Sequence, residues 1–226
     1  MKKQKFLLIH FFSLLFLSVS AQFVNPLEMS LGDAIVTTSS GERFEGRIKS
    51  TVGDQSGVVS LKFVTDHGDK QKLYASEIQE IKQKPGRWNK LEIFIDKSSD
   101  KKKQAHSNYE EVVKLDYIIW EQVELPNGKS FVMLQLLNPG FDSKIKVFYK
   151  PSADKGELSI GGVSIADSKV NEYYVVKDGK TYKMNKKLYK KGGYEELFGD
   201  CDYMTQLMPD YDDFAKEVFT YDQACK

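Results

Sequence analysis

The feature that most constrains this chain is a period-two alternation of apolar and polar residues, which is typical of half-buried β-strands. In residues 43–49, Phe44 and Ile48 share one face, while charged side chains occupy the other face. Gly46 lies between them on the apolar face, which predicts a bend or a close backbone approach. Similar short runs end at turn-forming residues, so a small antiparallel barrel or sandwich is expected, with strands near 33–38, 43–49, 59–63, 72–75, 78–81 and 91–95.

The alternation restarts after a polar stretch. Residues 96–108 contain no large apolar side chain, and we interpret them as a solvated loop or linker at a domain boundary. Later strands flank Pro126-Asn127-Gly128 and Asp178-Gly179, both of which are typical of antiparallel hairpins. The sequence therefore predicts a small N-terminal β domain and a second antiparallel β region, at residues 22–105 and 106–192.

The periodicity becomes helical near residue 185. Two apolar stripes at helical spacing follow, and Asp210 stands between them as a good N-cap for the second helix. We expect a C-terminal helical hairpin over residues 193–226, which makes the fold class α+β and mainly β. The stripes are Leu197, Phe198, Cys201, Met204, Leu207 and Met208, then Tyr211, Phe214, Ala215, Val218 and Phe219.

The first 21 residues have the layout of a secretory signal peptide. Lysines at the start precede an apolar run from Phe6 to Val19, and Ser20-Ala21 offers a cleavage site. The run is shorter than the roughly 20 residues that a membrane-spanning helix needs. We expect an exported protein, periplasmic or at the cell surface, with no transmembrane segment after cleavage near Ala21.

Cleavage would leave 205 residues, enough for one large domain or two small ones. Three lysines are lost with the leader, so the formal charge changes from +1 to −2, with 30 basic against 32 acidic residues. This balance gives no basic footprint for nucleic acid, and we expect no nucleic-acid partner. A content of 41% hydrophobic residues also argues against a disordered chain.

Two cysteines, Cys201 and Cys225, suggest a single disulfide in an oxidising compartment. Both lie on the apolar stripes. Two side-by-side helices would leave the sulfur atoms too far apart, because the cysteines lie at different depths along them. The bridge therefore needs a steep helix crossing or a tail that folds back. One buried and one free terminal thiol is the alternative.

Signatures of catalysis and metal binding are missing. The two histidines after the leader, His67 and His106, are not at zinc-ligand spacing, and Asp66 and Asp69 lack the oxygen-rich loop of a calcium site. No phosphate-binding loop or nucleophile elbow occurs. We expect no catalytic residue, no metal and no cofactor.

Charge is unevenly distributed near the C-terminus. Residues 194–226 contain nine acidic residues and two lysines, whereas five lysines crowd residues 183–191. One interpretation is a solvated helical face that the neighbouring lysines neutralise. The other is a docking surface for a basic protein of the cell envelope. Tyrosines are also frequent here, as parts of a core, an interface or a sugar platform.

Several short motifs have a counterpart elsewhere. They are Gly32-Asp33, Ser40-Gly41-Glu42, Gly46-Arg47-Ile48, the hairpin of 131–137 and 144–150, and a tail made of 197–201, Phe214 and 221–225 with its two cysteines. In these motifs the chain resembles a group of uncharacterised exported proteins common in Bacteroidota. The resemblance covers most of the chain after the leader. It implies an exported location and paired cysteines, and it supplies no catalytic residue.

Three functional hypotheses follow. The first is a non-enzymatic binding or interaction module of the bacterial cell envelope, with a possible envelope protein partner and its oligomeric state open. The second is a small-ligand carrier, which requires a dry apolar pocket lined by residues such as Phe44, Phe63, Trp120 and Phe131. The third is an unrecognised hydrolase, which requires a cleft with acids of shifted pKa.

Overall fold

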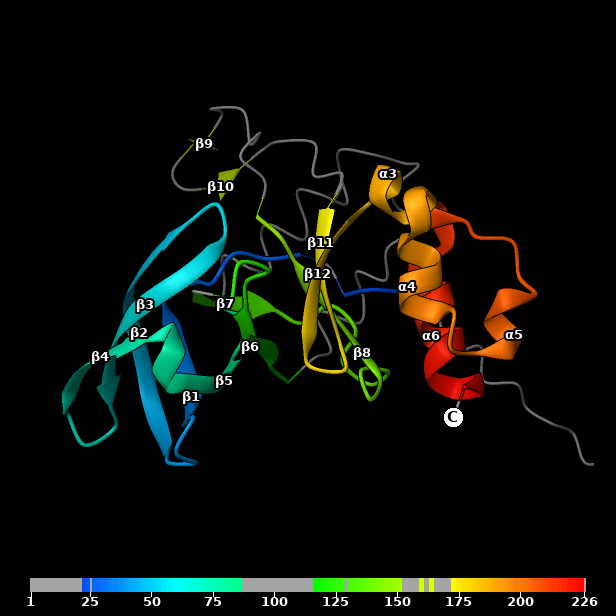
Figure 1. Cartoon of the computed structure of the whole chain (residues 1–226). Coiled ribbons are helices and arrows are strands. Elements are labelled where there is room, and N and C mark those ends of the chain that lie inside the picture. The colour runs from blue at the N-terminus through cyan, green and yellow to red at the C-terminus, as the bar shows by residue number, and fades with distance from the viewer. Residues whose placement is uncertain are drawn as a thin grey trace, which may run out of the picture.

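The computed structural model describes residues 22–24, 26–86, 116–128, 130–151, 159–160, 163–164 and 172–225. A β-barrel, a three-stranded sheet and a group of helices follow one another across the molecule (Figure 1). This architecture confirms the expected fold class, α+β and mainly β. The leader at 1–21, the strand at 91–95 and the loop at 96–108 lie outside the described residues.

Six antiparallel strands form the barrel. Their order is β2-β1-β5-β6-β7-β3, and pairing between β2 and β3 closes the ring, while β4 adds to the outer edge of β3 and the 3-10 helix η1 leads into β5. These elements are β1 (Gly32–Thr38), β2 (Arg43–Asp54), β3 (Gly57–Thr65), β4 (Lys70–Tyr74), η1 (Ala75–Glu77), β5 (Ile78–Gln83), β6 (Ile118–Glu124) and β7 (Phe131–Gln135).

The barrel takes strands from both sides of the predicted boundary at residue 105, because β6 and β7 complete the ring begun by β1 to β5. The strand β2 is long enough to pair with β1 along its first half and with β3 along its second. Gly46 lies where β2 changes partner. A Cβ atom there would stand 2.2 Å from the carbonyl oxygen of Val64, so the predicted close approach is present.

Apolar side chains fill the barrel. Each strand turns alternate residues inward, as the alternation predicts. The resulting core consists of Leu27, Ala34, Val36, Ile48, Leu61, Phe63, Leu73, Ala75, Ile78, Ile81, Ile118, Trp120 and Met133.

A second sheet lies beside the barrel and has the order β12-β11-β8. The β11–β12 hairpin turns at Asp178 and Gly179, which have φ of 50° and 73°, as an Asp-Gly turn of type I′ requires. A bridge between Leu136 and Phe148 joins the end of β7 to this sheet. The strands are β8 (Ile145–Tyr149), β11 (Glu172–Lys177) and β12 (Lys180–Asn185), and a separate short pair is β9 (Ser159–Ile160) with β10 (Val163–Ser164).

The helices cover the side of this sheet that faces away from the barrel (Figure 1). The expected C-terminal helix pair is present, but its first member is broken into short pieces, since the chain turns at Gly199 and is extended at Cys201. The elements are α3 (Lys186–Leu188), the kinked turn η3 (Tyr189–Gly193), α4 (Tyr194–Phe198), α5 (Asp202–Thr205), the 3-10 helix η4 (Tyr211–Asp213) and α6 (Phe214–Ala224).

Because of this break, only part of the first apolar stripe is buried. Met204 is buried, as expected, but Leu207 and Met208 are exposed because the helical path ends after Thr205. The predicted cap is correct: the Asp210 carboxylate accepts a hydrogen bond from the amide of Asp212 at 3.0 Å.

The segment at residues 22–24 and 26–30 connects the two halves of the molecule. Phe23 packs on Phe141 and Phe214 of the helical half, and the Val24 amide donates to the carbonyl of Leu137 at 2.8 Å. Three residues later, Leu27 enters the barrel core and is only 1% exposed. Its amide donates to the buried Gln135 side chain at 2.6 Å. The N-terminal segment therefore belongs to both cores.

We expect Leu27→Ala to lower the free energy of unfolding by about 2–5 kcal/mol, because it leaves a cavity where barrel and N-terminal segment meet. Urea unfolding of residues 22–226 measures this loss. The exposed Lys62→Ala in β3 is the control and should change stability by less than about 0.5 kcal/mol. Equal effects of the two substitutions would contradict a structural role for the segment.

Candidate functional site

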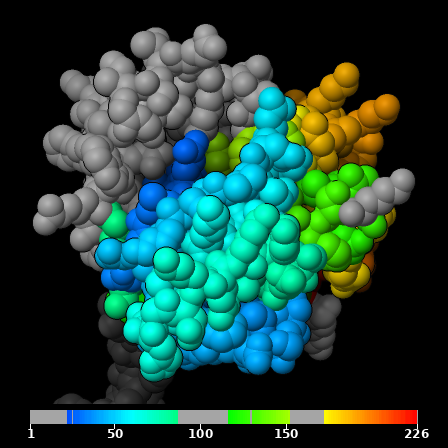
Figure 2. Space-filling view, turned by 90° about the vertical axis from the view of Figure 1, so that its left-hand side faces the viewer, coloured from blue at the N-terminus to red at the C-terminus, as the bar shows by residue number. Residues whose placement is uncertain are grey.

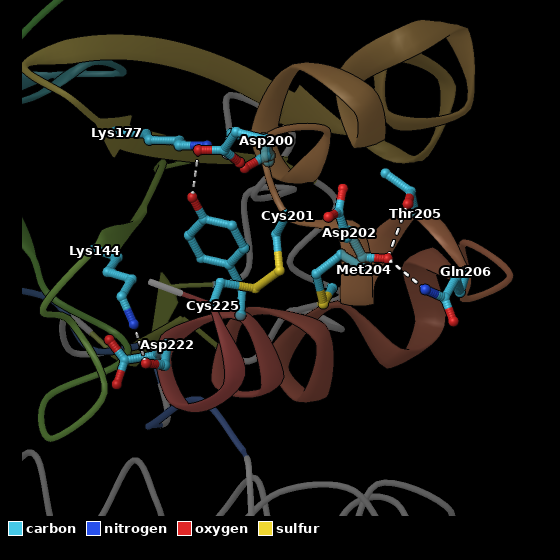
Figure 3. The surroundings of a disulfide bond; sticks show 12 residues. Lys144, Lys177, Asp200, Cys201, Asp202, Met204, Thr205, Gln206, Asp222 and Cys225 are labelled. Atoms are coloured by element: carbon cyan, nitrogen blue, oxygen red, sulfur yellow. Dashed lines mark hydrogen bonds and ion pairs between the residues drawn. A yellow bond between two sulfur atoms is a disulfide. The ribbon is translucent and has the colours of Figure 1, made fainter.

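The structure brings the two cysteines together. Cys201 stands at the start of α5 and Cys225 at the end of α6, and a disulfide joins them with a Cα–Cα distance of 5.7 Å (Figure 3). The sequence argument against two side-by-side helices holds, because Cys201 is not inside a continuous helix. The turn at Gly199 and Asp200 instead carries it to the end of α6.

An ion pair lies beside the disulfide. The ammonium of Lys177, at the end of β11, donates to Asp200 Oδ1 at 2.8 Å and to the carbonyl of Leu197 at 2.7 Å. The Tyr221 hydroxyl of α6 donates to Asp200 Oδ2 at 2.7 Å, and Lys177 also lies 4.7 Å from the Tyr221 ring centre. These contacts join the sheet, the turn after α4, and α6.

The ion pair and its hydrogen bonds keep Lys177 and Asp200 charged. Burial lowers the pKa of the Lys177 ammonium, but its bonds with Asp200 and Tyr221 outweigh burial and raise that pKa above its usual value. Burial likewise raises the pKa of the Asp200 carboxyl, and the bonds from Lys177 and Tyr221 bring it below its usual value. Both carboxylate oxygens are occupied, so we assign the cluster a structural role.

A buried acid lies elsewhere in the helical half. Glu217 of α6 is 6% exposed, and its Oε1 accepts a hydrogen bond from the amide of Asp210 at 2.9 Å. The Tyr189 hydroxyl donates to Oε2. Burial raises the pKa of the Glu217 carboxyl to about 7, although the bond from Asp210 acts in the opposite direction. Glu217 thus fixes the loop before η4 to α6.

Between these two anchors lies a segment that we call the docking segment, residues 202–213. Three of its large apolar side chains face solvent: Tyr203 is 53% exposed, Leu207 37% and Met208 91%. Exposed apolar groups gathered in a short stretch are a common mark of an interaction site.

A buried side chain and several hydrogen bonds hold the docking segment in place. Met204 is fully buried, and its carbonyl accepts a hydrogen bond from the Tyr194 hydroxyl at 2.5 Å. The carbonyl of Asp202 accepts bonds from the Thr205 hydroxyl and the Gln206 amide at 3.0 and 3.1 Å (Figure 3). A surface that is ordered before binding loses less entropy when a partner docks.

Charge around the docking segment is only partly neutralised. Lysines pair with three nearby acids, in Lys177–Asp200, Lys180–Glu196 and Lys186–Asp212, and of these lysines only Lys186 belongs to the group at 183–191 that was expected to neutralise this face. The segment itself has four aspartates and no basic residue. Among the described residues, Asp202 and Asp213 form no ion pair. The exposed apolar groups therefore stand in a negative surrounding.

Most of the tyrosines near the C-terminus belong to the core. Tyr174, Tyr189, Tyr194 and Tyr221 are buried, and Tyr173 is packed against Phe23 and Phe214. Burial alone raises the pKa of Tyr173 to about 12. Core packing is therefore the correct interpretation for these rings, whereas Tyr203 remains available for contact.

The four aromatic residues expected to line a carrier pocket do not come together. Phe63 and Trp120 are packed in the barrel core, Phe131 is exposed, and Phe44 lies partly buried at the barrel surface. His67 lies in the exposed turn between β3 and β4, and His106 is outside the described residues. The packed barrel does not favour the carrier hypothesis.

Two features of this region were missed from the sequence. Glu217 follows Phe214 by three residues and precedes Tyr221 by four, so its position on the buried face of α6 was readable from helical spacing. The bond between Lys177 and Asp200 had no such signal, because it joins a strand to a turn 23 residues away.

We expect the double variant Cys201→Ala, Cys225→Ala to lose about 3 kcal/mol of stability, as the loop closed by the disulfide becomes free in the unfolded chain. Denaturant unfolding with and without reductant measures it. Reduction should bring the natural chain to the stability of the variant and leave the variant unchanged. Equal stability of the variant and the oxidised natural chain would contradict the prediction.

The Glu217 carboxyl should make stability depend on pH. Its pKa is higher in the folded chain, about 7, than the value of 4.5 expected when unfolded, so the folded state binds the proton more tightly. Its contribution to stability therefore falls as pH rises from about 4.5 to 7. We expect Glu217→Gln to gain on the order of 3 kcal/mol relative to the natural chain between pH 4.5 and 8. Parallel stability curves would contradict this.

Three further observations bear on the kind of site. No three histidine, cysteine, aspartate or glutamate side chains in the described part of the chain are placed to hold a metal ion. No helix within the same residues is long and apolar enough to cross a membrane. No family model, curated protein or solved structure matches this chain.

Proposed function

We propose that this protein is an exported, non-enzymatic interaction module of the cell envelope, and that the docking segment is where it binds a partner protein. The observation that carries the proposal is the exposure of Tyr203, Leu207 and Met208 on a segment fixed at both ends. Exposed apolar side chains that are grouped on one surface are a mark of protein–protein interaction sites.

The partner's chemistry follows from the segment. Its aspartates, of which Asp202 and Asp213 have no ion pair among the described residues, favour a basic partner surface. The apolar groups at the centre require an apolar patch within that basic surface, because the core of an interface is largely free of charge. Apolar contact would supply the affinity, and the charges would supply selection and speed of association.

The order of the segment also supports this proposal. The disulfide and the Asp210–Glu217 bond hold it at both ends, while the Tyr194 hydroxyl holds its centre. A disulfide persists in the oxidising compartments where exported proteins work. The same bond would thus suit the proposed location and keep the binding surface in shape.

We expect a photoreactive benzoylphenylalanine at position 208 to cross-link one protein in the native envelope, identified by mass spectrometry. The control places the same residue at Val52, which is 58% exposed on the barrel. With the purified partner, Leu207→Asp should weaken binding about tenfold or more, since it puts a charge at the interface centre. Added salt should weaken binding further.

The proposal fails if position 208 yields no adduct, or if position 52 yields the same adducts. It also fails if Leu207→Asp leaves the affinity of the purified partner unchanged. Unchanged thermal unfolding of the variant shows that loss of binding does not come from loss of the fold.

A further inference from the structure

A second surface lies at the other end of the molecule, on the free edge of β4. Among the described residues β4 pairs with β3 alone, so its other edge has no strand beside it. Figure 2 views the barrel from this side, and the region of β4 and η1 faces the viewer there. A free edge presents unpaired backbone amides and carbonyls.

The register of β4 identifies which backbone groups face outward. In an antiparallel pair, residues alternate between those bonded to the neighbouring strand and those whose amide and carbonyl point away. The amide of Tyr74 donates to the Glu77 carboxylate at 2.9 Å instead of to β3. Tyr74 is therefore an outward position, and so are Lys72 and Lys70 at two-residue intervals. The amide and carbonyl of Lys72 are free to pair with an added strand.

A groove of about 650 Å³ runs beside this edge. The tip of the β1–β2 hairpin forms one wall, and β4 with η1 forms the other. The lining residues are Thr38, Ser39, Ser40, Glu42, Phe44, Gln71, Lys72, Leu73 and Glu77.

The groove walls are fixed and chemically distinct. Thr38 and Ser40 bond to each other through their hydroxyls at 2.8 Å, and the Thr38 hydroxyl accepts from the Glu42 amide at 3.1 Å, which orders the hairpin tip. Phe44 offers an apolar surface. Two glutamates, Glu42 and Glu77, line the groove together with Lys72, whose ammonium lies 4.7 Å from the Tyr74 ring centre.

We propose that this groove binds an extended peptide segment of a partner protein, which adds as a strand to the free edge of β4. Backbone pairing at Lys72 and Lys70 supplies the main contacts. An apolar side chain of the peptide packs on Phe44, and a basic side chain meets the negative charge of Glu42 and Glu77. This binding surface is separate from the docking segment and does not depend on it.

Selection from a random twelve-residue peptide library displayed on phage, with residues 22–226 as the target, tests the proposal. Selected peptides should alternate apolar or β-branched residues with polar ones and contain a lysine or arginine. Lys72→Pro removes the outward amide without removing a bond to β3, and should weaken the selected peptides about tenfold or more. The control, Lys72→Ala, keeps that amide and should bind within about threefold.

A second measurement does not depend on the proline variant. Peptide binding should slow hydrogen exchange at the amides of Lys70 and Lys72, and N-methylation of the pairing amides of the peptide should abolish binding. The proposal is overturned if no peptide is enriched, if Lys72→Pro binds as well as Lys72→Ala, or if exchange at both amides is unchanged by a bound peptide.

Discussion

Two buried glutamines need hydrogen-bond partners, and the N-terminal segment that supplies these partners also joins the two halves of the fold. Gln83 and Gln135 lie inside the barrel with at most 1% exposure, where an amide without hydrogen bonds is costly. The N-terminal segment supplies partners: the Leu27 amide donates to Gln135, and the carbonyl of Ser30 accepts from Gln83. The same segment places Phe23 among the rings of the helical half. The N-terminal segment thus links the barrel, through hydrogen bonds, to the helical half, through packing of aromatic rings.

The barrel and the helical half are stabilised by different interactions. The barrel is closed by backbone pairing and filled by apolar side chains, so its hairpins and its outer strand need little else to keep their shape. The helices are too short to be stable alone, and cross-links hold them on the sheet. A disulfide, a lysine–aspartate pair and a buried glutamate perform that task around α6. The proposed partner-binding segment is a by-product of this bracing.

Local features were readable from the sequence, whereas long-range ones were not. Alternation predicted the strands, Gly46 the close approach to β3, Asp178-Gly179 the hairpin, and Asp210 the helix cap, because each depends on neighbours in the chain. The hairpin of β6 and β7 was readable from Pro126-Asn127-Gly128, but its place in the barrel depends on pairing with β5 and β3 across many residues, which no local pattern encodes. The exposure of Met208 was missed for a related reason. Its position fits the helical spacing of the apolar stripe, but the helix ends before it, at Thr205.

The bond between Leu27 and Gln135 spans 108 positions in the chain. A polypeptide that emerges from a ribosome, or passes through a pore from its N-terminus, exposes Leu27 long before Gln135. Until then the barrel lacks both β7 and the partner of its entering segment, and contacts of such separation form slowly. Because Gln135 emerges so late, the barrel cannot close early. The emerging chain therefore stays unfolded, and able to pass through a narrow pore, until more than half of its length has appeared.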